Sequence, residues 1–367
     1  MRIAIDAREL TGHATGVGRY LMQLLLAWNE MPAATAHEFI LCTSTALEPQ
    51  ALPNLKITYR QRPRLEGTLW EQMALPLLVN DAQVLFAPAY TAPLFCRVPT
   101  VLTIHDVSFA AHPEWFGWKE GLRRRLLTRA SARQSARILT VSDFSKREIA
   151  KRLGVYRDKV EVIYSGVHQL SAGSRWRTGR DEPSNVNQRP LILYVGSVMN
   201  RRHVPELIAG FALLARTHPE VRLAIVGDNR TRPRIDLSAI ASQTGLAERI
   251  EIHDYIADER LAGLYEQASA FAFLSDYEGF GFTPLEALSA GVPPVVLETE
   301  VSREIYGRSA VYVKRPEPHA ICEGLECALY DSAERTRILD ISQHVLRRYS
   351  WRECAHRTLQ VLLACAS

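Results

Sequence analysis

The feature that most constrains the fold of this chain is a regular alternation of short apolar runs with longer stretches of helical periodicity. In the first half, apolar runs lie at residues 2–5, 39–42, 84–87, 99–104 and 138–141, and a helical stretch at 19–28 follows the first run. Runs of this length between helical patterns are typical of buried parallel strands that helices connect. We therefore predict an α/β fold with helices on both faces of a parallel sheet.

The alternation stops once and then begins again. Residues 169–190 are rich in Ser, Gly, Arg, Asn and Pro and have no strand or helix period, which is typical of a linker. A second series of apolar runs follows at 191–195, 222–226, 250–252, 270–274 and 294–297. A chain of 367 residues has room for two domains of about 100–200 residues each.

We accordingly predict two doubly wound, Rossmann-like domains, at 1–170 and 190–349, joined by a linker at 171–189 and followed by a helix at 350–367. In doubly wound domains, ligands bind at the carboxyl ends of the strands. The predicted site is therefore a central cleft that the two domains face.

Composition narrows the class of protein. The net charge of +4 is too small to indicate nucleic acid, but it suits a protein that meets anionic small molecules or an anionic membrane surface. No apolar run approaches the ~20 residues that span a bilayer, and Asp6 interrupts the first run, so no signal peptide is expected. The six cysteines are scattered and do not form a zinc pattern. We expect a cytoplasmic protein with reduced thiols.

Two polar clusters follow predicted strands of the first domain. Gly16, Gly18 and Arg19 lie between the first strand and the first helix, where glycines let the backbone approach a phosphate or an acceptor. A plain flexible turn is the alternative. His105 and Asp106 follow the run at 99–104, where an imidazole can bind a substrate hydroxyl or transfer a proton. A histidine held by a backbone carbonyl is the alternative there.

The second domain has a basic cluster and an acidic cluster. Arg201 and Arg202 follow the run at 191–195, and two arginines in a strand-to-helix loop can clamp a diphosphate, unless they form a solvated basic loop. Glu278 and Glu286, with seven residues between them, lie in the next such loop and in the helix after it. A loop carboxylate can accept sugar hydroxyls, and a helix carboxylate can accept ribose hydroxyls.

In their order and spacing, these clusters resemble glycosyltransferase family 4, a large family of retaining enzymes with the GT-B architecture. The resemblance extends along nearly the whole chain. It rests on Gly16-Val17-Gly18-Arg19-Tyr20, Ile104-His105-Asp106, Val141-Ser142-Asp143-Phe144-Ser145, Val162-Ile163-Tyr164-Ser165-Gly166-Val167, Tyr194-Val195-Gly196, and the E-x7-E pattern from Glu278 to Glu286.

The resemblance implies a role for each site residue. Glu278 would hold the donor sugar, and His105 would contact the sugar that is transferred. Arg202 stands where the family usually has a lysine that neutralises the diphosphate. The remaining implied contacts are Arg201, Gly16, Gly18 and Arg19 at the diphosphate or acceptor, Phe280, Gly281 and Phe282 at the donor, Glu286 at the ribose, Tyr255 and Ile256 at the base, and Asp106 at the acceptor. The helix from Ser350 would cross back to the first domain.

The resemblance also implies the reaction. It implies transfer with retention of anomeric configuration, and it points to GDP-mannose because the likeness is to bacterial mannosyltransferases of surface-polysaccharide (O-antigen) assembly. UDP- and dTDP-sugars remain open as donors. The acceptor would be a saccharide or a polyprenyl-diphosphate-linked oligosaccharide. A sugar-nucleotide 2-epimerase and a catalytically inert sugar-nucleotide-binding scaffold are the alternatives.

No metal and no cofactor are expected. Metal-dependent transferases hold their ion with an Asp-x-Asp pattern, and the chain contains none. Arginines, glycine-rich loops and helix N-termini can instead stabilise the charge of the leaving diphosphate.

A basic segment suggests contact with a membrane. Trp115 and Trp118 precede Arg123, Arg124 and Arg125, and a helix here would place a basic face beside aromatic side chains. Such a face suits anionic lipid headgroups at the inner surface of the cytoplasmic membrane. A solvated arginine-rich helix is the alternative, and binding to nucleic acid is not expected.

Overall fold

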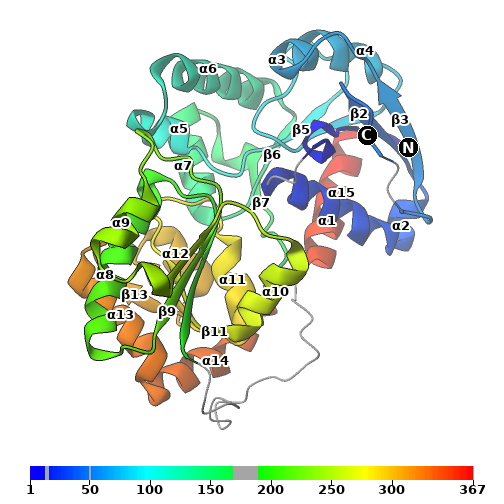
Figure 1. Ribbon diagram of the computed structural model, residues 1–367. Coiled ribbons are helices and arrows are strands. Elements are labelled where there is room, and N and C mark those ends of the chain that lie inside the picture. The colour runs from blue at the N-terminus through cyan, green and yellow to red at the C-terminus, as the bar shows by residue number, and fades with distance from the viewer. Residues whose placement is uncertain (13–15, 49–50, 168–188, 367) are drawn as a thin grey trace. The chain divides into compact units, whose positions relative to one another are not determined.

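The computed structural model describes residues 1–12, 16–48, 51–167 and 189–366 (Figure 1). The chain divides into two compact units, of which one contains Met1–Gly166 together with Tyr349–Ser367 and the other contains Val167–Arg348. Apart from Arg189, the expected linker at 171–189 lies outside the described residues.

A parallel sheet of seven strands forms the centre of the first unit. Its strands run in the order β3-β2-β1-β4-β5-β6-β7, so the direction of winding reverses between β1 and β4. The strands are β1 (Arg2–Asp6), β2 (Glu38–Thr43), β3 (Lys56–Gln61), β4 (Val84–Ala87), β5 (Thr100–Thr103), β6 (Arg137–Thr140) and β7 (Val160–Val162). A reversal of this kind leaves a crevice at the carboxyl ends of the two strands that flank it.

Helices cover both faces of this sheet because alternate residues of each buried strand point to opposite sides. On one face, Phe39 and Phe86 pack with side chains of α1 and α15; on the other, Leu85 packs with Trp70, and Leu102 packs with Ala132. The helical segments are η1 (Arg8–Leu10), α1 (Gly16–Asn29), α2 (Pro32–Thr35), α3 (Gly67–Leu69), the π-helical turn η2 (Trp70–Ala74), α4 (Leu75–Leu78), α5 (Ser108–Ala111), η3 (Pro113–Trp115), α6 (Trp118–Gln134), α7 (Asp143–Leu153), η4 (Arg157–Lys159) and α15 (Trp351–Ala366).

The last helix belongs to the first unit. Buried side chains of α15, Leu359 and Leu362 among them, join the core that Trp28 and Phe39 form. The indole Nε1 of Trp28 donates to the backbone carbonyl of Ala355 at 2.9 Å. Figure 1 shows α15 in red beside α1 in blue.

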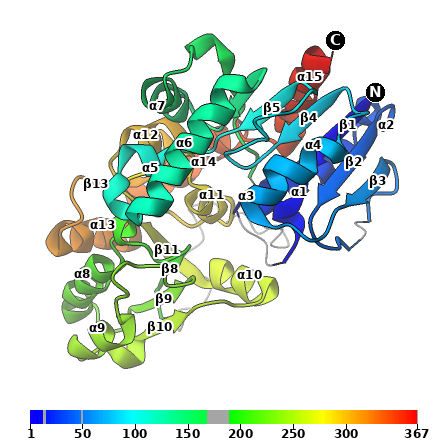
Figure 2. The ribbon, with the colours of Figure 1, turned by 90° about the horizontal axis from the view of Figure 1, so that it is seen from above.

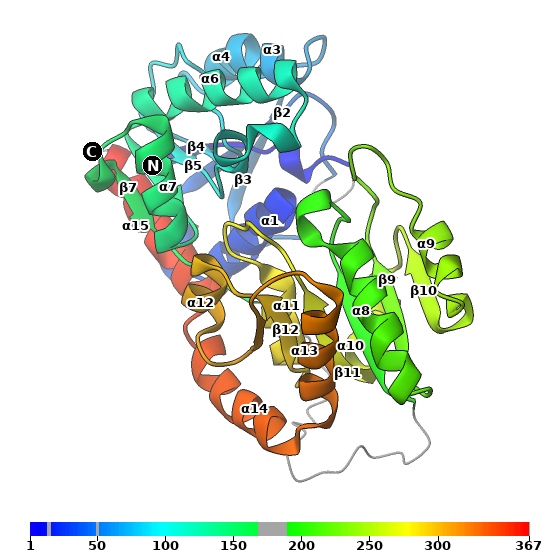
Figure 3. The same cartoon turned by 90° about the vertical axis from the view of Figure 1, so that its left-hand side faces the viewer.

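The second unit has a parallel sheet of six strands in the order β10-β9-β8-β11-β12-β13. The strands are β8 (Leu191–Val195), β9 (Arg222–Val226), β10 (Ile250–His253), β11 (Ala268–Phe273), β12 (Pro294–Leu297) and β13 (Val311–Val313). Its helical segments are η5 (Asn200–Arg202), α8 (Val204–Thr217), α9 (Leu237–Gln243), η6 (Ala247–Arg249), α10 (Asp258–Gln267), α11 (Phe282–Ser289), α12 (Glu300–Tyr306), α13 (Pro318–Tyr330) and α14 (Ser332–Leu346). Figure 3 shows α8 beside α13, which is its main helical neighbour.

The predicted fold class is confirmed, since both units are doubly wound and every paired strand is parallel. In the second unit the winding reverses between β8 and β11, which are hydrogen-bonded neighbours. The loops that follow these two strands contain the two polar clusters singled out in the sequence.

Candidate active site

The polar clusters of the second unit meet where the winding of its sheet reverses. Arg202 ends the short helix η5 after β8, and Glu278 lies between β11 and α11. Nε of Arg202 donates to Oε1 of Glu278 at 2.9 Å, and Nη2 lies 2.8 Å from the same oxygen. Sequence reasoning singled out both residues but did not predict that they bond to each other.

The surroundings of this ion pair hold it in one orientation. Nη1 of Arg202 donates to the Ser197 carbonyl at 2.9 Å, and its guanidinium lies 5.0 Å from the centre of the Phe273 ring. The hydroxyl of Ser275 donates to Oε1 of Glu278 at 2.9 Å. Only 14% of the Arg202 side chain and 18% of the Glu278 side chain are exposed. Burial opposes the charge on Arg202, but the Glu278 carboxylate and the Tyr194 side chain together raise the pKa of Arg202 above its ordinary value.

A second ion pair ties the same two loops together. His203 has a left-handed backbone, with φ of 50°, and its Nε2 lies 2.8 Å from Oδ2 of Asp276. Its Nδ1 lies 3.7 Å from Glu206, and the backbone N–H of Asp276 donates to the Arg201 carbonyl at 2.9 Å. Burial alone would lower the pKa of His203, but the hydrogen bonds to Asp276 and Glu206 raise it to about 9.

The turn that leads into α11 requires a glycine. Gly281 has φ of 84°, and a Cβ built on it would lie 2.1 Å from the hydroxyl of Tyr306, which donates to the Gly281 carbonyl at 2.9 Å. Phe280 is buried, and its ring centre lies 5.0 Å from that of Phe282. The turn therefore fixes the backbone of the predicted donor contacts Phe280, Gly281 and Phe282.

Glu286, on α11, accepts a hydrogen bond that the sequence did not predict. The hydroxyl of Tyr265, on α10, donates to Oε2 of Glu286 at 3.0 Å. No local signal marks Tyr265, because its contact comes from a different helix. The two residues predicted to contact the base differ in exposure, since Tyr255 is 76% exposed and Ile256 is buried.

In the first unit, His105 is held by a neighbouring loop. Its Nε2 lies 2.9 Å from the carbonyl of Pro88, which follows β4. A carbonyl oxygen can only accept, so Nε2 is assigned the ring proton and Nδ1 is left as an acceptor. Burial lowers the pKa of His105, so the ring is neutral at neutral pH. The hydrogen bond to a backbone carbonyl, which was the alternative role for His105, thus occupies one ring nitrogen and leaves the other for a ligand.

Tyr90 contacts both His105 and Asp106. Its ring lies beside that of His105, with centres 5.6 Å apart, and its hydroxyl donates to Oδ2 of Asp106 at 3.0 Å. The other oxygen of Asp106 accepts the backbone N–H of Ser108 at 2.7 Å. Tyr90 has φ of 63°, a region that a tyrosine rarely adopts, and residues with such backbones cluster at functional sites. Sequence reasoning missed Tyr90.

The glycine cluster of the first unit differs from its prediction. Helix α1 begins at Gly16 and not near Arg19, so Gly16, Gly18 and Arg19 lie in its first turns. Gly18 is buried, whereas Arg19 is exposed. Residues 13–15 of this cluster lie outside the described residues.

The residues predicted to contact a membrane also differ in their exposure to solvent. Trp118, Arg123 and Arg124 are exposed on α6, and Arg125 is partly buried there. Trp115 lies in η3, where its ring stacks on that of His112 with centres 4.0 Å apart. It is therefore not the exposed aromatic side chain that the sequence suggested.

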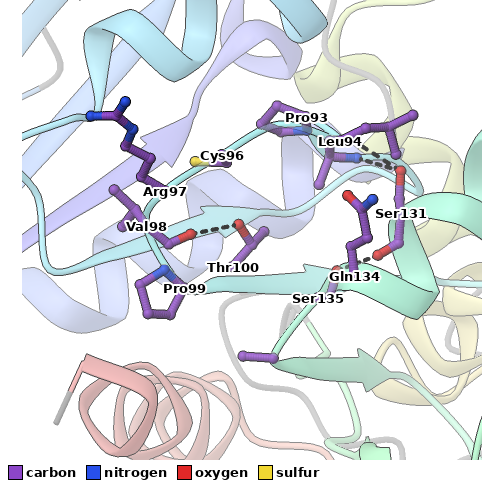
Figure 4. A pocket seen from close by; sticks show the side chains of 12 residues that line it. Pro93, Leu94, Cys96, Arg97, Val98, Pro99, Thr100, Ser131, Gln134 and Ser135 are labelled. Atoms are coloured by element: carbon purple, nitrogen blue, oxygen red, sulfur yellow. Dashed lines mark hydrogen bonds between the residues drawn. The ribbon is translucent and has the colours of Figure 1, made fainter.

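A pocket of about 230 Å³ lies away from these clusters. It is lined by residues of the segment 92–100, together with Ser131, Gln134, Ser135 and Ala136 (Figure 4). Thr100 begins β5 and Ala136 precedes β6, so the pocket lies at the amino ends of these strands. His105 follows β5 at the opposite edge, and the pocket is therefore not part of the candidate active site.

Comparisons with known families and proteins agree with the geometry. The family described as Glycosyltransferase Family 4 matches residues 14–169, and the family described as Glycosyl transferases group 1 matches residues 177–344. A D-inositol 3-phosphate glycosyltransferase of Xylanimonas cellulosilytica is 32% identical over 394 residues, covering 96% of this chain and 92% of the relative. O-antigen chain mannosyltransferase B of Escherichia coli is 26% identical over 386 residues, covering 98% of each.

A solved structure has the same fold. WaaG, a glycosyltransferase involved in lipopolysaccharide biosynthesis, superposes with a TM-score of 0.74 at 17% identity and with 99% coverage of each chain. This likeness confirms the predicted GT-B fold.

Proposed function

Because this chain is a glycosyltransferase of family 4, we propose that it transfers a hexose, with retention of configuration, from a nucleotide sugar to a saccharide or a polyprenyl-diphosphate-linked oligosaccharide. We assign mannose from GDP-mannose as the donor and bacterial surface-polysaccharide synthesis as the setting. The pairing of Arg202 with Glu278 at the reversal point of the sheet is the observation on which the proposal rests.

This pairing leaves atoms for both halves of a nucleotide sugar. A guanidinium has five N–H groups. That of Arg202 donates to Glu278 through Nε and to Ser197 through Nη1, and its Nη2 lies 2.8 Å from the same Glu278 oxygen. We assign the second N–H of Nη2 to an oxygen of the donor diphosphate. Arg202 and Ser275 bond to Oε1 of Glu278, and no residue in the described ranges donates to Oε2. We assign Oε2 to a hydroxyl of the donor sugar.

The chemical step then needs charge stabilisation and proton transfer. The bond between the anomeric carbon and the phosphate oxygen breaks, and a bond to the acceptor oxygen forms on the same face of the sugar. The leaving phosphate oxygen takes the proton of the acceptor hydroxyl. Arg202 stabilises the negative charge of the leaving group, and such a contact typically contributes about 3–4 kcal/mol in the transition state. Arg201 adds positive charge nearby, so we propose that no divalent metal is needed.

His105 has a binding role in this proposal. Its neutral ring can accept a hydrogen bond at Nδ1 while Nε2–H donates to the carbonyl of Pro88. We assign Nδ1 to a hydroxyl of the transferred sugar. We place Asp106, which Tyr90 orients, at the acceptor.

The choice of mannose rests on the likeness to the Escherichia coli O-antigen chain mannosyltransferase. Isothermal titration without metal tests it, with GDP, UDP, dTDP, ADP and their common sugar conjugates as ligands. We expect selective binding of GDP and GDP-mannose, which Glu286→Ala abolishes. Tyr265→Phe is the matched variant, since it removes only the hydroxyl that anchors Glu286, and it should weaken binding less.

The other outcomes of the titration would change the assignment. Selective binding of UDP or dTDP would keep the enzyme class and discard GDP-mannose. Binding of none of these ligands would contradict a nucleotide-sugar transferase and favour an inert scaffold protein that binds no sugar nucleotide. Activity that EDTA abolishes and magnesium or manganese restores would overturn the metal-free proposal, and a product of inverted configuration by NMR would overturn retention.

A further inference from the structure

The helix α6 has its side chains in an unusual arrangement. Its buried residues are Gly121, Thr128, Ser131 and Ala132, which are small or polar. Three of its large apolar residues face solvent at a spacing of four, with Trp118 73% and Leu126 60% exposed and Leu122 exposed between them. A helix that packs only on its own domain buries its large apolar side chains and exposes its polar ones.

A second helical segment of the same unit also exposes a stripe of apolar side chains. The continuous segment formed by α3, η2 and α4 buries Trp70 and Ala74. Leu69 and Met73, four residues apart, are each 62% exposed, and Leu77 continues the stripe one turn later. Two stripes of this kind need a common explanation, because single exposed apolar residues are ordinary but aligned ones are not.

The two stripes belong to one surface. Both helical segments cover the same face of the sheet, since Trp70 packs with Leu85 and Ala132 packs with Leu102, and both strand residues point to that side. The view in Figure 2 shows α6 beside α3 and α4, in agreement with Figure 1.

A loop joins the two stripes. The side chain of Gln72, in η2, bonds to the backbone of Leu94 at 2.8 Å and of Ala92 at 3.1 Å. Ser131, in α6, bonds through its hydroxyl to both backbone groups of Ala92 at 3.1 Å. Both helices therefore hold the segment that ends in Phe95, which is 85% exposed. We call the surface formed by Leu69, Met73, Leu77, Phe95, Trp118, Leu122 and Leu126 the apolar platform.

The platform has a basic border. Helix α6 contains six basic residues and one acidic residue, Glu120, which pairs with Arg124 at 2.8 Å. Lys119 and Arg123 are exposed next to the apolar stripe, and Arg97 is exposed two residues after Phe95. Aromatic and aliphatic side chains bordered by lysine and arginine are typical of segments that lie in the interface of an anionic bilayer.

We propose that the apolar platform docks this protein onto the surface of an anionic lipid bilayer. The apolar side chains enter the acyl boundary, and Lys119, Arg123 and Arg97 lie at the height of the headgroups. A second copy of the chain is a poorer occupant, because a symmetric contact would bring the same basic side chains of both copies together. The proposal does not depend on the identity of the donor or acceptor.

Sedimentation with vesicles tests the docking. We expect the full chain to bind phosphatidylcholine vesicles that contain about one-third phosphatidylglycerol, and to bind neutral phosphatidylcholine vesicles much more weakly. The triple variant Leu69→Ser, Met73→Ser and Phe95→Ser should lose binding. The variant Lys119→Gln with Arg123→Gln should weaken binding to the anionic vesicles by about tenfold or more.

Matched controls separate docking from general effects. Leu26→Ser changes an exposed leucine of α1, on the other face of the sheet, and Arg315→Gln changes an exposed arginine of the second unit; neither should alter sedimentation. Unchanged melting temperatures and nucleotide binding in all variants would show that fold and donor site are intact. Failure of the wild type to bind anionic vesicles would overturn the proposal. Self-association that the triple variant abolishes, without vesicle binding, would assign the platform to a second copy instead.

Discussion

At the scale of single residues, Arg202 and Glu278 show how the site depends on distant parts of the chain. They lie 76 positions apart in the sequence, yet each is the main charged partner of the other. A partly buried ion pair of this kind contributes little net stability, but the loss of one partner leaves the other charge buried and unpaired. Its value for the transferase is therefore the fixed position of two groups.

Replacement of Arg202 should separate charge from geometry. We expect Arg202→Met to lower kcat/KM by about 10²–10³-fold and stability by about 3 kcal/mol, because it removes a transition-state contact and strands Glu278. Arg202→Lys retains the charge and should lose less of both. Steady-state kinetics and urea unfolding measure the two effects. Arg230→Met, at an exposed arginine of the same unit, should change neither, and equal losses for Met and Lys at position 202 would contradict a role for the charge.

His203 should make stability depend on pH in a defined direction. Its pKa is raised to about 9 in the folded protein by Asp276 and Glu206, although burial opposes the charge. The stabilisation is thus complete below the ordinary pKa of about 6.5 and is lost as the pH rises through about 9. We expect wild type to exceed His203→Asn in urea midpoint at about pH 6 and to approach it at about pH 10. Asparagine tolerates the left-handed backbone, so strain does not confound the comparison. A constant difference between wild type and variant at the two pH values would exclude the ion pair as its cause.

Several site residues could not be found from the sequence, for a physical reason. Glu278, Glu286 and Arg202 follow strands in recognisable local patterns. Tyr265 and Tyr90 contribute one hydroxyl each to a carboxylate 21 and 16 positions away, and no spacing rule predicts such bonds. A residue whose role comes only from tertiary contact leaves no periodic signal in the sequence.

At the scale of elements, the turn before α11 determines where the helix and its backbone N–H groups lie. We expect Gly281→Ala to destabilise the chain by well over the ~1 kcal/mol that a positive φ alone costs, because its Cβ would collide with Tyr306. Gly291→Ala is the matched control, since Gly291 has a similar φ of 75° with open space around it. Melting temperatures measure the difference. Equal losses at both glycines would show that the Tyr306 contact is unimportant.

The strands also show what sequence patterns can predict. The ten apolar runs all became strands, because buried parallel strands are apolar on both faces. Strands β3, β7 and β13 were not predicted. β3 is an edge strand whose residues are all exposed or half-buried, and β7 and β13 have three residues each. Short or half-exposed strands acquire their conformation from the neighbour with which they pair, and their own residues show little pattern.

At the scale of the whole molecule, the two ends of the chain share one core. The first residues form the centre of the first sheet, and α15 covers that sheet after the chain has formed the entire second unit. The sequence predicted this last helix, but its periodicity alone did not reveal which unit it covers. The first unit is therefore complete only after the last residues have packed.

This connectivity predicts which part of the molecule a mutation in α15 will weaken. Leu362 is fully buried against the first sheet, so Leu362→Ala should cost about 2–5 kcal/mol. We expect calorimetry to show a lower transition temperature for the first unit. The transition of the second unit, which bound nucleotide shifts to higher temperature, should not change. Gln360→Ala, at an exposed position of the same helix, should shift neither. A mutation five residues from the chain's end would then act on the unit that contains its beginning. A shift of the nucleotide-sensitive transition alone would instead place the stabilising role of α15 in the second unit.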